Sequence, residues 1–139
     1  MTRNDGPITG GCLCGAVRYE VQGEPYKVSY CHCRSCRKAT GAPVVVMVMF
    51  RDFQVRWPGS EPRRHESSPG VRRGFCATCG TPITWEGVWD GGPIFEVHVS
   101  TLDHPERFPP DRHAFVRERI RWFDVADDHP RYEGASPAN

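Results

Sequence analysis

Short stretches in which apolar and polar residues alternate are the dominant pattern along this chain. They occupy residues 16–21, 26–30, 53–57 and 94–99. Because successive side chains of a strand point to opposite faces, each stretch predicts a half-buried β-strand. Residues 44–50 instead form a continuous apolar run of valine, methionine and phenylalanine. This run is rich in β-branched residues and short for a helix, so it predicts a strand buried on both faces.

Proline and glycine pairs separate these stretches and define the connections. A further strand is expected at residues 82–85, residues 58–70 are expected to form a polar loop, and residues 103–112 an irregular connection. One short helical turn is expected from about Ser35 to Thr40, ended by Gly41. The pattern therefore predicts an all-β fold, mainly antiparallel, with a minor short helix.

Length and charge limit the domain count and the kinds of partner. With 139 residues, we expect a single domain at 1–139, with a core at about 8–126 and a flexible tail at 127–139 that lacks an apolar period. The formal charge is only +1, which argues against nucleic acid and membrane surfaces as partners. The polar start and the absence of a long apolar run favour a cytoplasmic protein.

Seven cysteines change this picture, because they fall into three clusters. The clusters are Cys12 and Cys14, then Cys31, Cys33 and Cys36, then Cys76 and Cys79. In a reducing compartment such spacing favours metal ligands over disulfides. A structural zinc takes four protein ligands, whereas a catalytic zinc keeps one position open. If the first and third clusters close one site, the middle cluster is left with three sulfurs and an open position.

Local sequence supports this division. Gly15 and Gly80 directly follow the last thiol of their clusters, where a positive φ lets the chain fold back around a metal. In the middle cluster, Cys31 and Cys33 lie two apart on an extended segment and share a face, while His32 points away. Cys36 reaches the same point from the first helical turn.

An alternative is that both sites are structural. The middle site would then be closed by a distant histidine, for which the candidates are His65, His98, His104 and His113. His32 is a less favoured fourth ligand because of the alternation of side chains.

The cysteine segments and their flanks resemble one known family, the glutathione-dependent formaldehyde-activating enzymes, which is grouped with the centromere protein V domain. The matching pieces are residues 11–19, 31–38, 41–43 and 75–83, followed by 101–103, His113, Trp122, Phe123 and 127–130. The resemblance covers residues from about 8 to 132. It implies a Mss4-like fold shaped like a tent.

The resemblance also implies two zinc ions in each chain. The structural one would bind Cys12, Cys14, Cys76 and Cys79, and the catalytic one would bind Cys31, Cys33 and Cys36 in a site that can be partly empty. The reaction implied is the reversible addition of glutathione to formaldehyde. Three thiolates weaken the electrophilicity of zinc and suit a soft fourth donor, so a bound thiol would be held as the thiolate. We therefore expect a carbon–sulfur lyase that joins a glutathione-like thiol to a small carbonyl.

Other residues are weaker candidates for this chemistry. Arg34 and Lys38 lie within the middle segment and are the nearest cations for a substrate carboxylate, whereas Arg63, Arg64, Arg72 and Arg73 flank the polar loop and are expected to be solvated. His32 and His98 could relay a proton, although packing is the favoured role for both. The four tryptophans are expected in the core or at its rim, with Trp85 and Trp89 as less favoured candidates for a pocket wall.

Two rival functions remain. A non-catalytic, zinc-stabilised interaction module of the Mss4-like fold would not need an accessible middle site. A zinc-ribbon nucleic-acid binder is disfavoured by the balanced charge.

Overall fold

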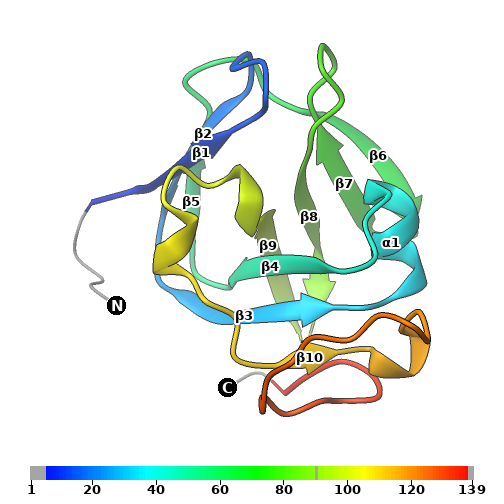
Figure 1. The fold of residues 1–139 in the computed structure, drawn as a ribbon. Coiled ribbons are helices and arrows are strands. Elements are labelled where there is room, and N and C mark those ends of the chain that lie inside the picture. Colours follow the sequence, from blue (N-terminus) through cyan, green and yellow to red (C-terminus); the bar gives the residue numbers. More distant parts are fainter. Residues whose placement is uncertain (1–5, 90, 138–139) are drawn as a thin grey trace.

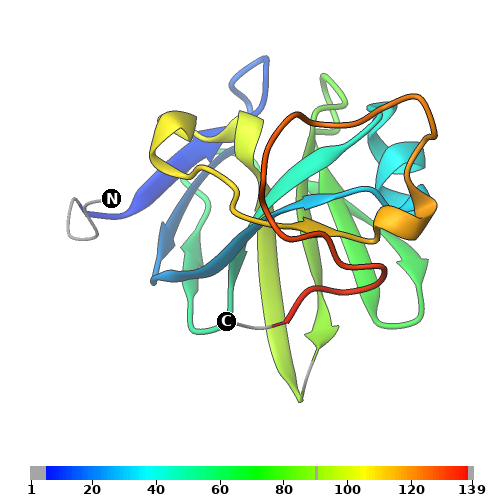
Figure 2. The ribbon, with the colours of Figure 1, turned by 60° about the horizontal axis from the view of Figure 1, so that its bottom comes forward.

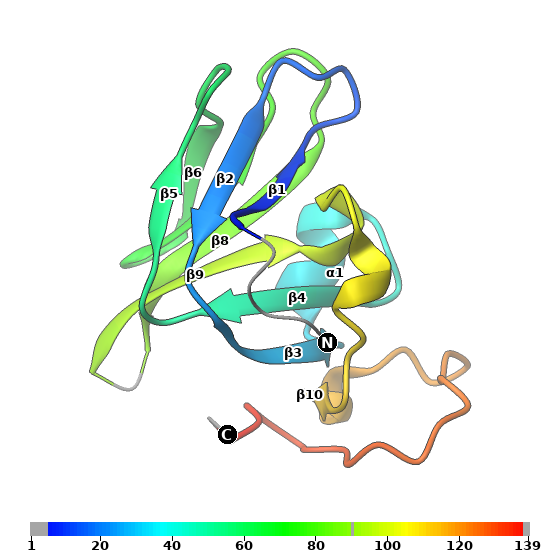
Figure 3. The ribbon, with the colours of Figure 1, turned by 90° about the vertical axis from the view of Figure 1, so that its left-hand side faces the viewer.

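The computed structural model describes residues 6–89 and 91–137, which build two β-sheets that diverge like the sides of a tent (Figures 1 and 3). The smaller sheet has the order β1-β2-β5, with β1 at Ile8–Gly11, β2 at Arg18–Gln22 and β5 at Gln54–Arg56. All of its pairings are antiparallel.

The larger sheet has the order β10-β3-β4-β9-β8-β7-β6. Its strands are β3 (Pro25–Cys31), β4 (Val45–Phe50), β6 (Arg63–Ser68), β7 (Val71–Phe75), β8 (Pro82–Trp89), β9 (Gly92–His98) and β10 (His113–Ala114). The pairing of β10 with β3 is parallel, and the pairings from β3 to β6 are antiparallel. The prediction of a mainly antiparallel all-β fold is confirmed.

Helical structure is short, as the sequence predicts. Helix α1 spans Arg34–Thr40, and Gly41 ends it with a left-handed φ of 76°. Single 3₁₀ turns follow β9 and β10, at η1 (Val99–Thr101), η2 (Pro105–Arg107) and η3 (Val116–Glu118). The connection through η1 and η2 is held to β2 by an ion pair of 2.6 Å between Arg18 and Asp103.

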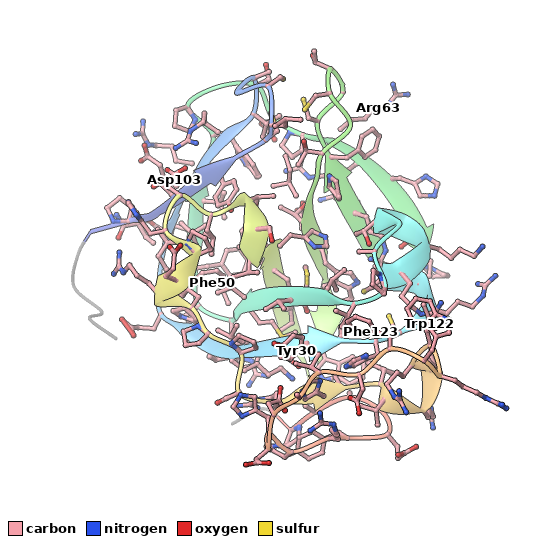
Figure 4. All side chains as sticks on the ribbon, in the orientation of Figure 1. Tyr30, Phe50, Arg63, Asp103, Trp122 and Phe123 are labelled. Atoms are coloured by element: carbon pink, nitrogen blue, oxygen red, sulfur yellow. The ribbon has the colours of Figure 1, made fainter. Side chains whose placement is uncertain are left out.

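The main core fills the space between the two sheets. Its buried side chains come from alternate positions of β2, β4 and β9, namely Tyr19, Val21, Val48, Phe50, Phe95 and Val97. Phe50 points into this space (Figure 4). Because β4 is buried on both faces, as predicted, Met47 and Met49 point the other way. This second face of the larger sheet carries the cysteines of the middle cluster.

The polar loop expected at residues 58–70 is a wrong prediction, because β6 lies within it. Strand β6 pairs with β7 at the edge of the larger sheet, and almost all of its side chains are exposed. An edge strand with no buried face has no apolar alternation, so the sequence pattern gives no strand signal there.

The C-terminal segment, residues 127–137, lies along β10 and crosses the end of the larger sheet (Figure 2). The amide of Tyr132 donates to the carbonyl of His113 at 2.8 Å, and the amide of Phe115 donates to the carbonyl of Gly134 at 2.8 Å. Lys27 donates to both oxygens of the buried Ser136. The sequence predicts a flexible tail at 127–139, whereas residues 127–137 are hydrogen-bonded into the fold. Residues 138 and 139 lie outside the described residues, as do residues 1–5.

Within residues 6–89 and 91–137, every helix is too short to reach across a lipid bilayer.

Candidate active site

Four cysteine sulfurs meet where the two sheets approach each other. Cys12 and Cys14 come from the turn between β1 and β2, and Cys76 and Cys79 come from the turn between β7 and β8. Their sulfurs all lie within 4.8 Å of one another, with Cys12 and Cys14 at 3.6 Å and Cys14 and Cys76 at 3.8 Å. A tetrahedral zinc with bonds of about 2.3 Å separates its sulfur ligands by about 3.8 Å. This four-sulfur group therefore fits a four-coordinate metal ion.

The turns that carry these sulfurs have the geometry expected from their glycines. Gly15 and Gly80 have φ values of 85° and 81°, in the left-handed region that glycine adopts without a Cβ clash. Each turn then aims amides at sulfur: Val17 donates to Cys12 Sγ at 3.3 Å, and Cys79 donates to Cys76 Sγ at 3.4 Å. Amides directed at sulfur stabilise the thiolate form that a metal requires.

The remaining three cysteines form a second group at the start of α1. Cys31 ends β3, Cys33 caps the helix and Cys36 lies in its first turn, and their sulfurs lie within 4.8 Å of one another. The amide of Cys36 donates to Cys33 Sγ at 3.3 Å. Contacts with the Cys31 and Cys36 thiols lower the pKa of Cys33, whereas contacts with Cys33 and Cys36, together with burial, raise the pKa of Cys31. This three-sulfur group could also hold a metal ion, and among the described residues no histidine, carboxylate or further cysteine completes it.

His32 lies away from the three-sulfur group and is fully buried. Its Nε2 is 2.9 Å from Nδ1 of His113, whose Nε2 is 3.0 Å from the Asp127 carboxylate. The ring of Tyr30 stacks on His113 with centroids 4.3 Å apart. Burial lowers the pKa of His32 to about 4. This chain of side chains fastens the C-terminal segment to the end of β3.

The other histidines considered from the sequence also lie outside the three-sulfur group; they are His65, His98, His104 and His113. His98 lines other depressions of the surface, and burial lowers its pKa to about 4.

A cavity of about 340 Å³ opens beside the three-sulfur group, and all three of its cysteines line it. We call it the site cavity. Met47, Met49 and Trp85 pack together on the sheet side of the cavity, and Phe115 packs against the same cluster. Trp89 lines the cavity as well, so both tryptophans that were less favoured as pocket walls take part in it. Residues 135 and 136 contribute to the wall from the C-terminal segment.

Charged groups in the site cavity come from strands far apart in the sequence. Arg73 of β7 places Nη1 3.6 Å from Cys36 Sγ, and Lys27 of β3 and Glu96 of β9 line the same space. The sequence does not single out Lys27 or Glu96 and predicts a solvated Arg73. The alternation of Val71, Arg73 and Phe75 is the signal that could have placed Arg73 on an inward face.

Arg34 and Lys38, the cations nearest to the cysteines in sequence, are exposed and do not line the site cavity. The amide of Arg34 donates to the Glu118 carboxylate at 2.8 Å, which fixes the start of α1.

Comparison with known proteins identifies a family whose model spans both cysteine groups. The family model described as "Glutathione-dependent formaldehyde-activating enzyme" matches residues 7–118. A Halomonas elongata protein named as a candidate glutathione-dependent formaldehyde-activating enzyme is 27% identical over 132 residues, covering 85% of this chain and 80% of that protein. An uncharacterized lyase of Schizosaccharomyces pombe is 31% identical over 86 residues, which is 62% of each chain.

A crystal structure of a Rhodobacter sphaeroides protein superposes with a TM-score of 0.54 at 25% identity, covering 69% of this chain and 88% of the other. Since the family match extends over most of the chain and contains all seven cysteines, the chain belongs to the glutathione-dependent formaldehyde-activating enzyme family.

Proposed function

We propose that this protein is a zinc-dependent carbon–sulfur lyase that reversibly joins a glutathione-like thiol to formaldehyde or a related small carbonyl. The observation that carries the proposal is that all three cysteines of the three-sulfur group line the site cavity. A metal held by these three sulfurs has one position facing a space large enough for substrates.

The two cysteine groups take different roles in this proposal. Cys12, Cys14, Cys76 and Cys79 would hold a structural zinc, and Cys31, Cys33 and Cys36 would hold the catalytic one. When bound to the three sulfurs, zinc would keep an incoming thiol ionised at neutral pH, where a free thiol is largely protonated.

The chain's own residues would bind and orient the two substrates. Arg73 is the cation beside the sulfurs, so it is placed to attract an anionic thiol. Met47, Met49 and Trp85 present an apolar surface that limits water around the carbonyl. Holding both reactants beside each other lowers the entropic part of the barrier. Arg34 and Lys38 stay candidates for carboxylates that extend beyond the site cavity.

Exchange NMR of glutathione, formaldehyde and their adduct tests the proposal. We expect the zinc-loaded protein to accelerate exchange at least about tenfold over the spontaneous rate, because both proximity and thiol ionisation favour addition. Cys36→Ser should abolish the acceleration. A wild-type protein that leaves the spontaneous rate unchanged with glutathione and formaldehyde would contradict this substrate pair.

A further inference from the structure

One row of side chains crosses five strands of the larger sheet beneath the site cavity. The pairing registers align Lys27 with Met49, Met49 with Glu96, Glu96 with Trp85, and Trp85 with Arg73. All five residues line the site cavity. Glu96 is at the centre of this row, with a cation at each end.

The Glu96 carboxylate is unusual because none of the hydrogen bonds or ion pairs described for residues 6–89 and 91–137 involves it. The Glu96 side chain is half-buried, and a carboxyl that is partly withdrawn from water without a partner costs free energy. The cross-strand neighbours of Glu96 on this face, Met49 and Trp85, are apolar, so an apolar residue would suit this position. An unpartnered carboxyl facing a substrate cavity is typical of a group that exchanges protons with a substrate.

Burial raises the pKa of the Glu96 carboxyl to about 8. The charged groups that face it are Lys27 from β3 and Arg73 from β7, which oppose this rise, and Cys33 from the start of α1, which adds to it. Glu118 lines the cavity from η3. A carboxyl that titrates near neutral pH is present in both forms and can act in both directions of a reversible reaction.

We propose that Glu96 is the general acid and base of the thiol–carbonyl reaction at the three-sulfur group. This inference rests on the proposed function, and it names the residue that handles the proton. The family resemblance and the cysteine pattern do not identify such a residue.

The incoming thiol loses its proton to solvent, and its sulfur forms the carbon–sulfur bond while the carbon–oxygen π pair moves onto oxygen. The Glu96 carboxyl gives that oxygen its proton and is then protonated again from solvent. In the reverse direction, the Glu96 carboxylate removes the hydroxyl proton, the carbon–sulfur bond breaks, and sulfur leaves as the thiolate. Thiol and carbonyl thus give the hydroxyalkyl adduct with no other reagent.

The direction of the pH dependence follows from these roles. Addition by the enzyme with bound thiolate needs the protonated carboxyl, so kcat for addition at saturating substrates should fall as the pH rises through about 8. Cleavage of the bound adduct needs the carboxylate, so kcat for cleavage should rise over the same interval.

Glu96→Gln tests the inference, because it keeps the size of the side chain and removes its titration. We expect kcat for the glutathione–formaldehyde reaction to fall by about 10²–10⁴-fold. The pH dependence of kcat should disappear for both addition and cleavage, and zinc content and circular dichroism should not change. Glu20→Gln is the matched control, since Glu20 lies on the smaller sheet and pairs with the exposed Arg56. It should keep wild-type rates. Glu96→Asp should have a reduced kcat that still depends on pH in both directions of the reaction.

Infrared difference spectra give a readout that does not depend on activity. Between about pH 6 and about pH 10, the zinc-loaded wild type and Glu20→Gln should lose the carbonyl band of a protonated carboxylic acid, and Glu96→Gln should lack this change.

The outcomes separate the two proposals. An active wild type with an equally active Glu96→Gln overturns the role of Glu96 and leaves the proposed function intact. An inactive wild type overturns the proposed function, and the role of Glu96 with it. If Glu96→Gln fails to fold, a Glu96→Asp protein with flat pH profiles would overturn the inference.

Discussion

At the scale of single residues, Arg72 and Arg73 show how one position along a strand separates a surface cation from a site cation. Arg73 lines the site cavity and contacts Cys36, whereas the more exposed Arg72 pairs with Glu86 on the other face of β7. Both residues are arginines, and the alternation of side-chain direction along the strand decides which of them faces the sulfurs. They therefore form a natural pair of variants.

We predict that Arg73→Met weakens zinc binding at the three-sulfur group by roughly tenfold to a hundredfold. The reason is that a hydrogen bond to a charged partner contributes about 1.5–3 kcal/mol, and Arg73 is the cation that contacts these sulfurs. Chelator competition with the purified protein measures the affinity.

Arg72→Met is the control for this experiment. Its pair with Glu86 is 3.6 Å long and the side chain is 54% exposed, so its loss should change zinc affinity less than about twofold. Equal effects of the two substitutions would show that Arg73 acts only through the overall charge of the protein.

At the scale of secondary-structure elements, the sequence predicts strands with a clear apolar pattern and misses the exposed edge strand β6. Strands β2, β3, β4, β5 and β9 show either alternation or a continuous apolar run, the first half of β8 is expected at residues 82–85, and the glycine after α1 marks its end. Strand β6 carries only polar residues, so no periodicity reveals it. Pairing partners and registers are set by contacts between distant segments, which a single sequence does not display.

The same reasoning explains which parts of the site could be predicted. The members of each cysteine cluster follow from local spacing, and the joining of the first and third clusters follows from the coordination number of zinc. The site cavity is lined by Lys27, Glu96 and Arg73 only because five neighbouring strands of one sheet pair in a particular register. Proximity in sequence favoured Arg34 and Lys38 instead, and both side chains project from the exposed face of α1.

The C-terminal segment gives a prediction at this scale. Truncation after Glu133 removes the carbonyl partner of the Phe115 amide and both oxygens that accept from Lys27. We expect the free energy of unfolding to fall by about 1.5–4.5 kcal/mol, since each of the three lost hydrogen bonds contributes about 0.5–1.5 kcal/mol. Urea denaturation measures this change.

The truncation should also raise KM, because residues 135 and 136 form part of the site cavity wall. Zinc content should stay at the wild-type value, since every cysteine is retained. Unchanged stability and an unchanged KM would indicate that the segment does not contribute to the cavity in solution.

At the scale of the whole molecule, the two cysteine groups connect different parts of the fold. The four-sulfur group connects the turn of the smaller sheet with a turn of the larger one, so it holds the two sides of the tent together. The three-sulfur group draws all of its ligands from one short stretch between β3 and α1. Trp122, 79% exposed, lies near α1 outside both groups (Figure 4).

This difference predicts distinct effects for two otherwise similar substitutions. Cys79→Ser should lose one zinc and the fold together, because structural zinc contributes on the order of 10 kcal/mol to folding. Cys36→Ser should lose one zinc and leave the domain folded. Metal analysis and circular dichroism distinguish these results.

Thermal unfolding of the two variants provides the decisive comparison. If Cys36→Ser unfolds as completely as Cys79→Ser, the three-sulfur group is structural, and the assignment of catalysis to it is wrong.

The four-sulfur group also imposes an order on biosynthesis. Cys14 and Cys76 are 62 positions apart, and Cys79 follows the whole of β7. A ribosome must therefore make more than half of the protein before the four ligands can meet. The three-sulfur group is complete once residue 36 has emerged, so a growing chain can capture a metal ion there well before its two sheets are joined.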